Sequence, residues 1–200
     1  SSAIIETRQQ VSFSGLPGYS SIETRFIIGS DGSIEIDSRF NMDADLRHLP
    51  RIGVTWVIPA GFEQLSYWGR GPGENYQDRK LSTRLGVFSG LIEQEHFPFI
   101  PPSENGGHEE THWLELQNSL GQAIRFTPER PCHFDIHHST VTDYKEARHE
   151  HELERRPESY LHLDAAHSGI GSDMGWSTVL DVQTQTPAGL YRLACTVQVL

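Results

Sequence analysis

The feature that most constrains the fold of this chain is a two-residue alternation of apolar and polar side chains, in runs that glycine and proline keep short. Eighteen glycines and eleven prolines are spread over the 200 residues without forming a linker-like tract. Alternation at period two places apolar side chains on one face of a β-strand, whereas a surface helix repeats every 3.6 residues. The chain is therefore predicted to consist mainly of short strands joined by turns.

Several runs show this alternation clearly. Two of them flank Ser30-Asp31-Gly32-Ser33 within residues 22–40, and Asp-Gly tolerates the positive φ of a tight turn, so a hairpin is predicted there. The other predicted strands, in chain order, lie at 52–58, 65–67, on both sides of a turn at 118–121 within 113–126, at 132–136 and at 191–199. In the 132–136 strand, Cys132, Phe134 and Ile136 share one face. The last strand alternates most cleanly and is predicted to be half-buried.

One segment departs from this pattern. Residues 142–155 contain neither glycine nor proline, consist largely of good helix formers, and begin with Thr142 and Asp143 as possible N-cap residues. A short helix is predicted there. The complete prediction is a single all-β domain over 1–200, folded as a two-sheet antiparallel β-sandwich with one short helix. A barrel stays open as an alternative, because the pattern does not determine topology.

Charge and composition exclude some functions. Sixteen Lys and Arg against 27 Asp and Glu give a formal charge of −11, which argues against nucleic acid and anionic membranes as partners. No apolar run approaches the ~20 residues of a membrane helix, so a soluble chain is expected. Cys132 and Cys195 lie in apolar-alternating stretches and are expected to be buried thiols, which favours a cytoplasmic location. The chain does not begin with Met, so we expect a piece of a longer protein.

The eleven histidines raise the hypothesis of a metal site. His133 and His137 would share one face of a strand while His138 points to the other, and His149 and His151 would lie about 200° apart around a helix. Ligands arranged in this way do not converge on one point, as zinc requires. Structural roles are therefore favoured, and no metal site is predicted.

Two loops rich in glycine and proline carry polar groups. The first is Trp68–Arg79 (WGRGPGENYQDR), which displays charged side chains and one tyrosine on a sharply turning backbone. The second is Ile100–Thr111 (IPPSENGGHEET), whose possible acid or base groups are Glu104, His108, Glu109 and Glu110. Because charged residues in loops are mostly solvated, catalysis from this second loop alone is not favoured.

A third loop, Ser168–Ser177 (SGIGSDMGWS), contains a tryptophan without any apolar alternation that would place it in a core. The apolar C–H faces of sugar rings stack on flat aromatic surfaces, and the indole offers the largest one. Trp176 is thus a candidate carbohydrate contact. The alternative is a tryptophan that closes one end of the sandwich.

Together these segments resemble the C-terminal domain of the large microbial β-galactosidases of glycoside hydrolase family two, which some bacteria encode as a separate small chain. Order and approximate spacing agree from about residue 20 to the C-terminus. The motifs are Arg51-Ile52-Gly53, Trp68-Gly69, Gly71-Pro72, Glu74-Asn75-Tyr76, Asp78-Arg79, Pro102-Ser103-Glu104-Asn105-Gly106, Gly169-Ile170-Gly171, Asp173 and Trp176. The resemblance implies a supersandwich similar to galactose mutarotase. Because the family domain begins well upstream of Ser1, it also implies that this chain is the later portion of that domain.

The resemblance further implies a function. The parent enzyme would hydrolyse terminal β-galactosides such as lactose with retention, using two glutamates in a separate barrel domain or large subunit, so that this chain alone would be inactive. Trp176 would stack on substrate sugars, and Glu104, Asn105 and Asp173 would support the surrounding loops. No cofactor is expected in this chain, while Mg and Na are expected in the catalytic domain of the parent. The parent is expected to be oligomeric.

Departures from the family keep alternatives open. Where the family commonly has arginines after its Ser-Glu-Asn-Gly motif, this chain has His108 and His112, so the salt bridge normally built there is in doubt. One alternative function is an aldose 1-epimerase, with either His108 and Glu104 or His167 and Asp173 as acid and base. The other is a free-standing carbohydrate-binding module.

Overall fold

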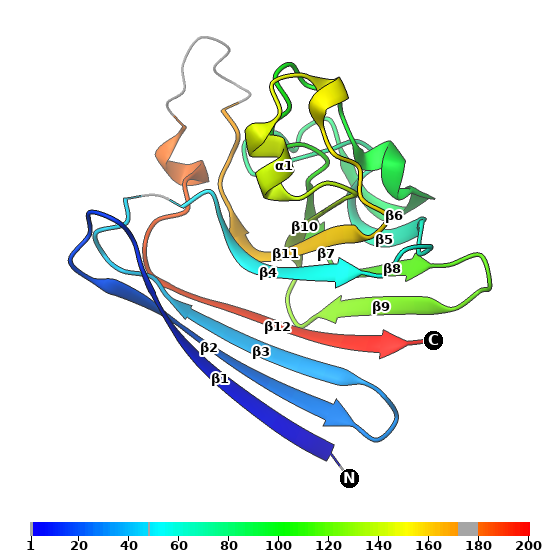
Figure 1. Ribbon diagram of the computed structural model, residues 1–200, viewed down its shortest axis with the longest axis horizontal. Coiled ribbons are helices and arrows are strands. Elements are labelled where there is room, and N and C mark those ends of the chain that lie inside the picture. Colours follow the sequence, from blue (N-terminus) through cyan, green and yellow to red (C-terminus); the bar gives the residue numbers. More distant parts are fainter. Residues whose placement is uncertain (1, 48, 172–179) are drawn as a thin grey trace.

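Two antiparallel sheets pack face to face in the computed structural model, which describes residues 2–47, 49–171 and 180–200 (Figure 1). Within these ranges the larger sheet has eight strands, in the spatial order β1 (Ser2–Ser12), β2 (Tyr19–Gly29), β3 (Ile34–Asn41), β12 (Leu190–Val199), β9 (Ala123–Pro128), β8 (Trp113–Gln117), β5 (Gln64–Gly71) and β6 (Arg84–Leu91). The smaller sheet has four, in the order β4 (Arg51–Ile58), β11 (Ser159–His167), β10 (Cys132–His137) and β7 (His108–Thr111). The predicted two-sheet antiparallel fold is confirmed.

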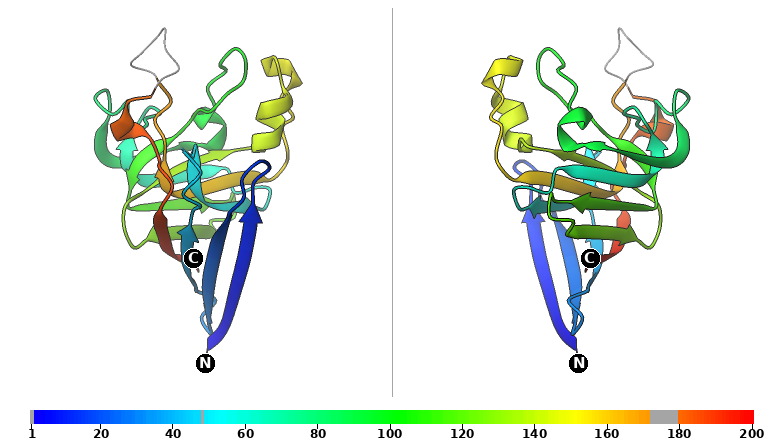
Figure 2. Two further views of the ribbon diagram at one scale, coloured as in Figure 1. Left: turned by 90° about the vertical axis from the view of Figure 1, so that its left-hand side faces the viewer. Right: turned by 90° about the vertical axis from the view of Figure 1, so that its right-hand side faces the viewer.

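The hydrophobic core lies between the two sheets and is formed by alternate residues of their strands. The larger sheet contributes, among others, Leu65 and Tyr67 of β5, Leu114 and Leu116 of β8, and Phe126 of β9. The smaller sheet contributes Phe134 and Ile136 of β10 together with Leu161 and Leu163 of β11. Because every second side chain of the strands that pack here faces this layer, period-two patterning is a reliable guide to them. The β1–β2 end of the larger sheet extends past the smaller sheet (Figure 2).

The predicted hairpin over residues 22–40 is confirmed as β2 and β3, which pair from Ser21 opposite Asn41 to Ile28 opposite Ile34. Gly32 has φ +83°, as the turn requires. The prediction of one apolar face for residues 132–136 is correct but incomplete. His133, Asp135 and His137 on the opposite face of β10 are buried as well, so this strand is covered on both sides.

The helix predicted over residues 142–155 is wrong in its extent. The α-helix α1 spans only Val141–Glu146 and is followed by a 3-10 turn, η2 (Glu150–Glu152). The N-cap is Thr140, whose hydroxyl accepts a hydrogen bond from the Asp143 amide. Ala147 already has extended backbone angles. The reason is tertiary, because Arg156 binds the Asp143 carboxylate with two hydrogen bonds and turns the chain back.

Two further 3-10 turns, η1 (Ile92–Glu95) and η3 (Val182–Thr184), complete the helical elements of the described residues. None of the helices in these ranges has the length and apolar character required to cross a membrane. Cys132 and Cys195 are both buried free thiols, which confirms the expectation for these two residues.

Removing a core side chain tests the packing of the two sheets. Leu163 of β11 is fully buried between them, and replacing it by alanine should destabilise the fold by about 2–5 kcal/mol because a cavity remains. Leu190→Ala at the exposed start of β12 is the control, and its effect should stay within about 0.5 kcal/mol. Urea unfolding measures both, and equal effects would contradict the assignment of the core.

The Asp143 ion pair predicts a pH dependence of stability. The hydrogen bonds from Arg156 and Thr140 hold the pKa of Asp143 below its usual value. An acid with a depressed pKa stabilises the fold above the pKa of the unfolded chain, about 3.9, and loses this contribution as the pH falls further. Asp143→Asn should therefore lower the free energy of unfolding at pH 7, with a deficit that shrinks below about pH 4. Urea titrations at both pH values check this, and exposed Thr142→Ala should show a small deficit that does not change with pH.

Candidate functional site

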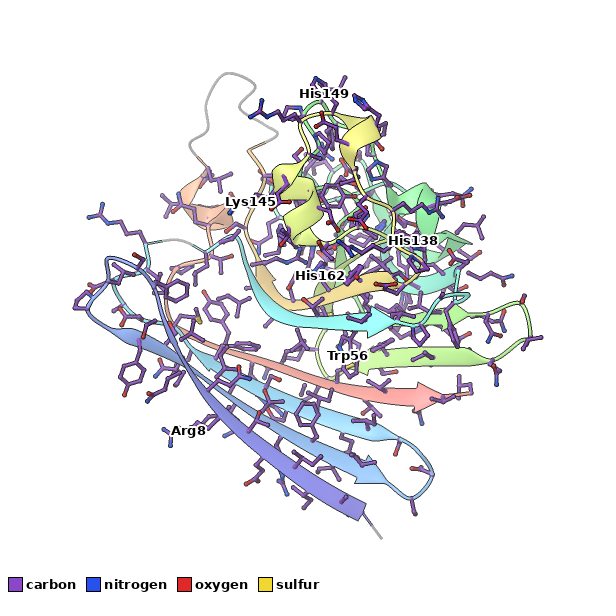
Figure 3. All side chains as sticks on the ribbon, in the orientation of Figure 1. Arg8, Trp56, His138, Lys145, His149 and His162 are labelled. Atoms are coloured by element: carbon purple, nitrogen blue, oxygen red, sulfur yellow. The ribbon has the colours of Figure 1, made fainter. Side chains whose placement is uncertain are left out.

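The face of the smaller sheet that points away from the core carries a cluster of buried polar and charged side chains. Alternation on each strand places them there, since their neighbours in sequence fill the core. The segment containing α1 and the loop before β7 cover this face (Figure 1). Figure 3 shows His162 on the sheet and Lys145 on α1 above it. We call this set the central cluster; it comprises Arg51 of β4, His133, Asp135 and His137 of β10, His162 and Asp164 of β11, and Glu104, Glu109 and His167 around them.

Arg51 is the hub of the central cluster. Its Nη2 atom donates to Asp164 Oδ2 at 2.6 Å and also binds Asp135 Oδ2, while its Nε atom lies 3.4 Å from Asp164 Oδ1. On the other side, Nη1 lies 3.7 Å from Glu104 Oε2. The two aspartate side chains are each only 2% exposed. A buried carboxylate is costly unless it is paired, so Arg51 makes the burial of both possible.

Gly53 explains part of the Arg51-Ile52-Gly53 motif. It pairs with Asp164 across β4 and β11. A Cβ atom at this position would lie 2.1 Å from the Leu163 carbonyl oxygen and 2.2 Å from Asp164 Oδ1. Since no side chain fits there, the absence of one at Gly53 lets the Asp164 carboxylate fold back over β4 towards Arg51.

The carboxylates of the central cluster differ in electrostatics. Burial alone would raise the pKa of Asp135, but Arg51 and a 2.7 Å hydrogen bond from His162 Nδ1 outweigh it and hold that pKa well below its usual value. Glu104 lies on a loop, and its neighbours stabilise its ionised form less than those of Asp135 do. Burial and the charge of Asp135 raise the pKa of Glu104 to about 7, although Arg51 opposes the shift. With this pKa, Glu104 can exchange a proton near neutral pH.

Two histidines stack against each other beside Glu104. The rings of His133 and His167 have centroids 4.3 Å apart and planes inclined by 22°. His133 Nδ1 lies 3.1 Å from Glu109 Oε1, and His167 Nδ1 lies 2.7 Å from the Ser168 carbonyl oxygen. Burial, together with the charges of His133 and Arg51, lowers the pKa of His167 to about 3, so this ring is neutral at physiological pH.

The two loops rich in glycine and proline, 68–79 and 100–111, are joined to each other by hydrogen bonds. Asn75, in the loop after β5, is fully buried and accepts a hydrogen bond from the Glu109 amide at 2.9 Å. Tyr76 Oη accepts from the Gly107 amide at 3.1 Å and lies 3.5 Å from Glu104 Oε1. Glu-Asn-Tyr in the first loop thereby holds the backbone of the second.

A small cavity lies between the central cluster and α1. Its volume is about 210 Å³, and its lining includes Arg51, Glu104, Asp135, Tyr144 and His162. Asn105, which also lines it, accepts a hydrogen bond from the Phe97 amide and donates one to the Ser103 carbonyl. Glu104 and Asn105 thus both stand at this cavity.

The loop predicted to bear the sugar contact is anchored at its base. Asp78 accepts hydrogen bonds from the amides of Ile170 at 3.2 Å and Gly171 at 2.7 Å. The Ser168 hydroxyl donates to the Leu49 carbonyl at 2.6 Å. Asp173 and Trp176 lie outside the described residues, so both interpretations of Trp176 stay open.

The departures from the family pattern have clear structural outcomes. His108 is fully buried, with Nε2 at 2.6 Å from Glu95 Oε2 and Nδ1 at 3.1 Å from the Tyr67 hydroxyl. Glu95 is therefore the acidic partner of this histidine. His112 stacks on Trp68, with ring centroids 4.0 Å apart. His108 thus contacts Glu95 rather than Glu104, its proposed partner in an epimerase.

The fold places the remaining polar residues of interest, Glu109, His138, His149 and His151, in different environments. Glu109 is buried and lies 3.5 Å from Lys80 Nζ, which shows that the expectation of a solvated loop was wrong for this residue. His138 Nε2 lies 2.9 Å from Glu63. His149 and His151 stack on each other at 5.5 Å on the exposed surface of η2, and Figure 3 shows His149 far from the sheet.

Replacing Arg51 by an uncharged residue should lower the free energy of unfolding. Arg51→Met would leave the carboxylates of Asp135 and Asp164 buried without a counter-ion, so we expect a loss of about 3–5 kcal/mol in the free energy of unfolding. Arg192→Met is the control, because Arg192 binds Asp37 and Glu129 at the surface, where ion pairs contribute about 0–1 kcal/mol. Urea unfolding at pH 7 measures both. A loss under 1 kcal/mol for Arg51→Met would contradict its role as hub.

Comparison with known proteins places the chain in a family. The family model described as β-galactosidase small chain matches residues 2–197. A β-galactosidase of Vibrio cholerae is 35% identical over 153 residues, which is 76% of this chain and 14% of that protein. The β-galactosidase BgaC of Bifidobacterium adolescentis is 29% identical over 178 residues, or 86% of this chain and 17% of that protein.

A solved structure, of the GalM/aldose epimerase homologue from C. elegans, aligns with 100% of this chain and 65% of its own, at a TM-score of 0.46 and 10% identity. The chain spans only 14% and 17% of the length of the two curated relatives. The family model, in contrast, covers nearly the whole chain. The chain therefore belongs to the β-galactosidase small-chain family.

Proposed function

We propose that the protein containing this chain is a retaining β-galactosidase that hydrolyses terminal β-galactosides such as lactose. The observation that carries the proposal is the match of the small-chain family model to residues 2–197, together with relatives that are named β-galactosidases and are several times longer. In this arrangement the chain is one domain of a larger enzyme. Its catalytic barrel, in the same polypeptide or in a large subunit, is the principal partner.

The carboxylates of the central cluster support a catalytic centre outside this chain. Retaining hydrolysis uses two carboxyl groups ~5–5.5 Å apart that both reach the anomeric carbon of the sugar. Asp135 and Asp164 are each 2% exposed and are bound by Arg51, which fits a structural role for both acids better than a catalytic one. The isolated chain is expected to be inactive.

The contribution of the chain would be a binding surface. We place the stacking contact at Trp176, on the loop whose base Asp78 anchors, and assign loop support to Glu104, Asn105 and Asp173. Covering a sugar face with an indole buries apolar area worth on the order of 1–2 kcal/mol. Such a contact changes substrate affinity by about 5–30-fold, with little direct effect on bond cleavage.

Further features of the parent belong to the same proposal. The chain would be the later portion of the small-chain domain, and any Mg or Na ions of the enzyme would lie in its catalytic domain. An oligomeric parent and a cytoplasmic location complete it. The net charge of −11 fits a neutral sugar substrate better than an anionic polymer.

The full-length enzyme tests the binding role. Trp176→Ala should raise KM and inhibitor Ki by about 5–30-fold while the first chemical step changes little. Trp176→Phe should recover part of the affinity because an aromatic face remains. Steady-state and single-turnover kinetics with a galactoside separate binding from chemistry.

A second variant tests whether the Asp78 hydrogen bonds support the proposed sugar contact at Trp176. Asp78→Asn replaces one of the two acceptors of the Ile170 and Gly171 amides by an NH₂ group, so it should shift KM in the same direction as Trp176→Ala. Asp31→Asn in the exposed β2–β3 turn is the matched control and should leave KM unchanged. Unaltered KM and Ki in Trp176→Ala would refute the assignment of the sugar contact.

A further inference from the structure

Three side chains of the central cluster direct possible metal-ligating atoms at one another. One nitrogen each of His133 and His167 and one oxygen of Glu104 all lie within 4.8 Å of one another. His167 Nε2 and Glu104 Oε1 are 3.7 Å apart. The residues come from β10, from the end of β11 and from the loop before β7. Their proximity is therefore a product of the fold, and no spacing in the sequence reveals it.

The tautomers of both histidines follow from their partners. Glu109 Oε1 and the Ser168 carbonyl oxygen can only accept hydrogen bonds, so each must receive a proton from the Nδ1 atom that faces it. In the neutral ring, Nε2 then carries a lone pair and no hydrogen. A histidine that ligates a metal almost always has this arrangement, with its other N–H donated to a carboxylate or a backbone carbonyl.

His133 provides an independent observation. Its side chain is 2% exposed, and its Nε2 atom is buried without a hydrogen-bond partner. Leaving a buried polar atom without a partner is costly, so such atoms are rare in folded proteins. One ring nitrogen of His133 lies within 4.8 Å of the ligating atoms of Glu104 and His167. Since Nδ1 is bound to Glu109, a group bound to Nε2 at this point is the simplest way to satisfy that atom.

The charges around the site favour a dication. Within the described residues, the carboxylates of Glu104, Glu109, Asp135 and Asp164 surround this point, and the Lys and Arg side chains paired with them are Arg51 and Lys80. An ion of charge +2 would balance this excess of negative charge. Two imidazole nitrogens and one carboxylate oxygen form a ligand set that suits zinc, whereas Mg²⁺ and Ca²⁺ prefer oxygen ligands.

We propose that His133, His167 and Glu104 form a binding site for Zn²⁺ or a similar transition-metal ion. Zinc bonds to these atoms are ~2.0–2.2 Å long, so the ligands must close in slightly and the stacked rings must tilt towards a common point. Glu104, 36% exposed on its loop, is the ligand best able to move. No local sequence pattern points to this set, because His167 and Glu104 lie far from His133 along the chain.

The experiment uses the full-length protein after treatment with a chelator, and Zn²⁺ or Co²⁺ is added as the only probe. The unmodified protein should bind one more zinc ion per chain than His133→Gln or His167→Gln, as measured by elemental analysis after dialysis. Bound Co²⁺ should give the intense visible bands of tetrahedral coordination, and both variants should lose them. Glu109→Gln, which alters the hydrogen bond to His133 and the ion pair with Lys80 but removes no ligand, should weaken zinc binding by about 10–100-fold.

Controls keep the result interpretable. His149→Gln removes a surface histidine that stacks on His151 and should leave the number of bound zinc ions and the Co²⁺ spectrum unchanged. If the buried variants do not fold, Glu104→Gln decides, since Glu104 is partly exposed, and it should also lose the Co²⁺ bands. A Co²⁺ spectrum that is unchanged in a folded ligand variant, or equal zinc content in all of them, overturns the proposal.

Discussion

The pairing of one buried guanidinium with two buried carboxylates is the interaction on which the outer layer of this molecule depends. Arg51 binds Asp135 and Asp164 at a place where neither acid could stay ionised alone. Because Arg51 compensates these charges in part and binds both carboxylates, the outer face of the smaller sheet can be covered by loops instead of remaining in water. Both sides of β10 are consequently buried, and Glu104 and the stacked histidines occupy the layer between the sheet and its cover.

The loops next to this layer are held in place by side chains of one segment. The Glu74-Asn75-Tyr76 segment supports the backbone before β7, and Asp78 supports the backbone after β11. Both supports come from a single loop, so the two segments they hold are coupled mechanically. The binding surface proposed for the loop around Trp176 begins from this rigid base.

Much of the fold could be predicted from the sequence, because half-buried strands leave a local, two-residue signature. The hairpin over residues 22–40 and the strands at 52–58 and 191–199 were found in this way. The end of α1 could not be found, since it depends on Arg156 returning to Asp143. Helix propensity over residues 142–155 carries no information about that contact.

The site was harder to predict, for a physical reason. Alternating polar residues on β10 are typical of a solvated face, and only the partner strands show that the face is covered. Arg51 lies 84 and 113 residues from the two acids that it binds, a separation that no local pattern can bridge. The glycines of the family motifs were visible, but their purpose, as at Gly53, became clear only once the atoms that approach them were known.

The first strand of the larger sheet has a consequence of its own. β1 is paired only with β2 within the described residues and is exposed along almost its entire length, including Ile4 and Ile5. Its outer rim offers eleven residues of backbone whose amides and carbonyls can serve as a template for another strand. When the chain is prepared in isolation, its copies are expected to associate first through the free edge of β1. The yield of a soluble preparation should then depend on how this single edge is shielded.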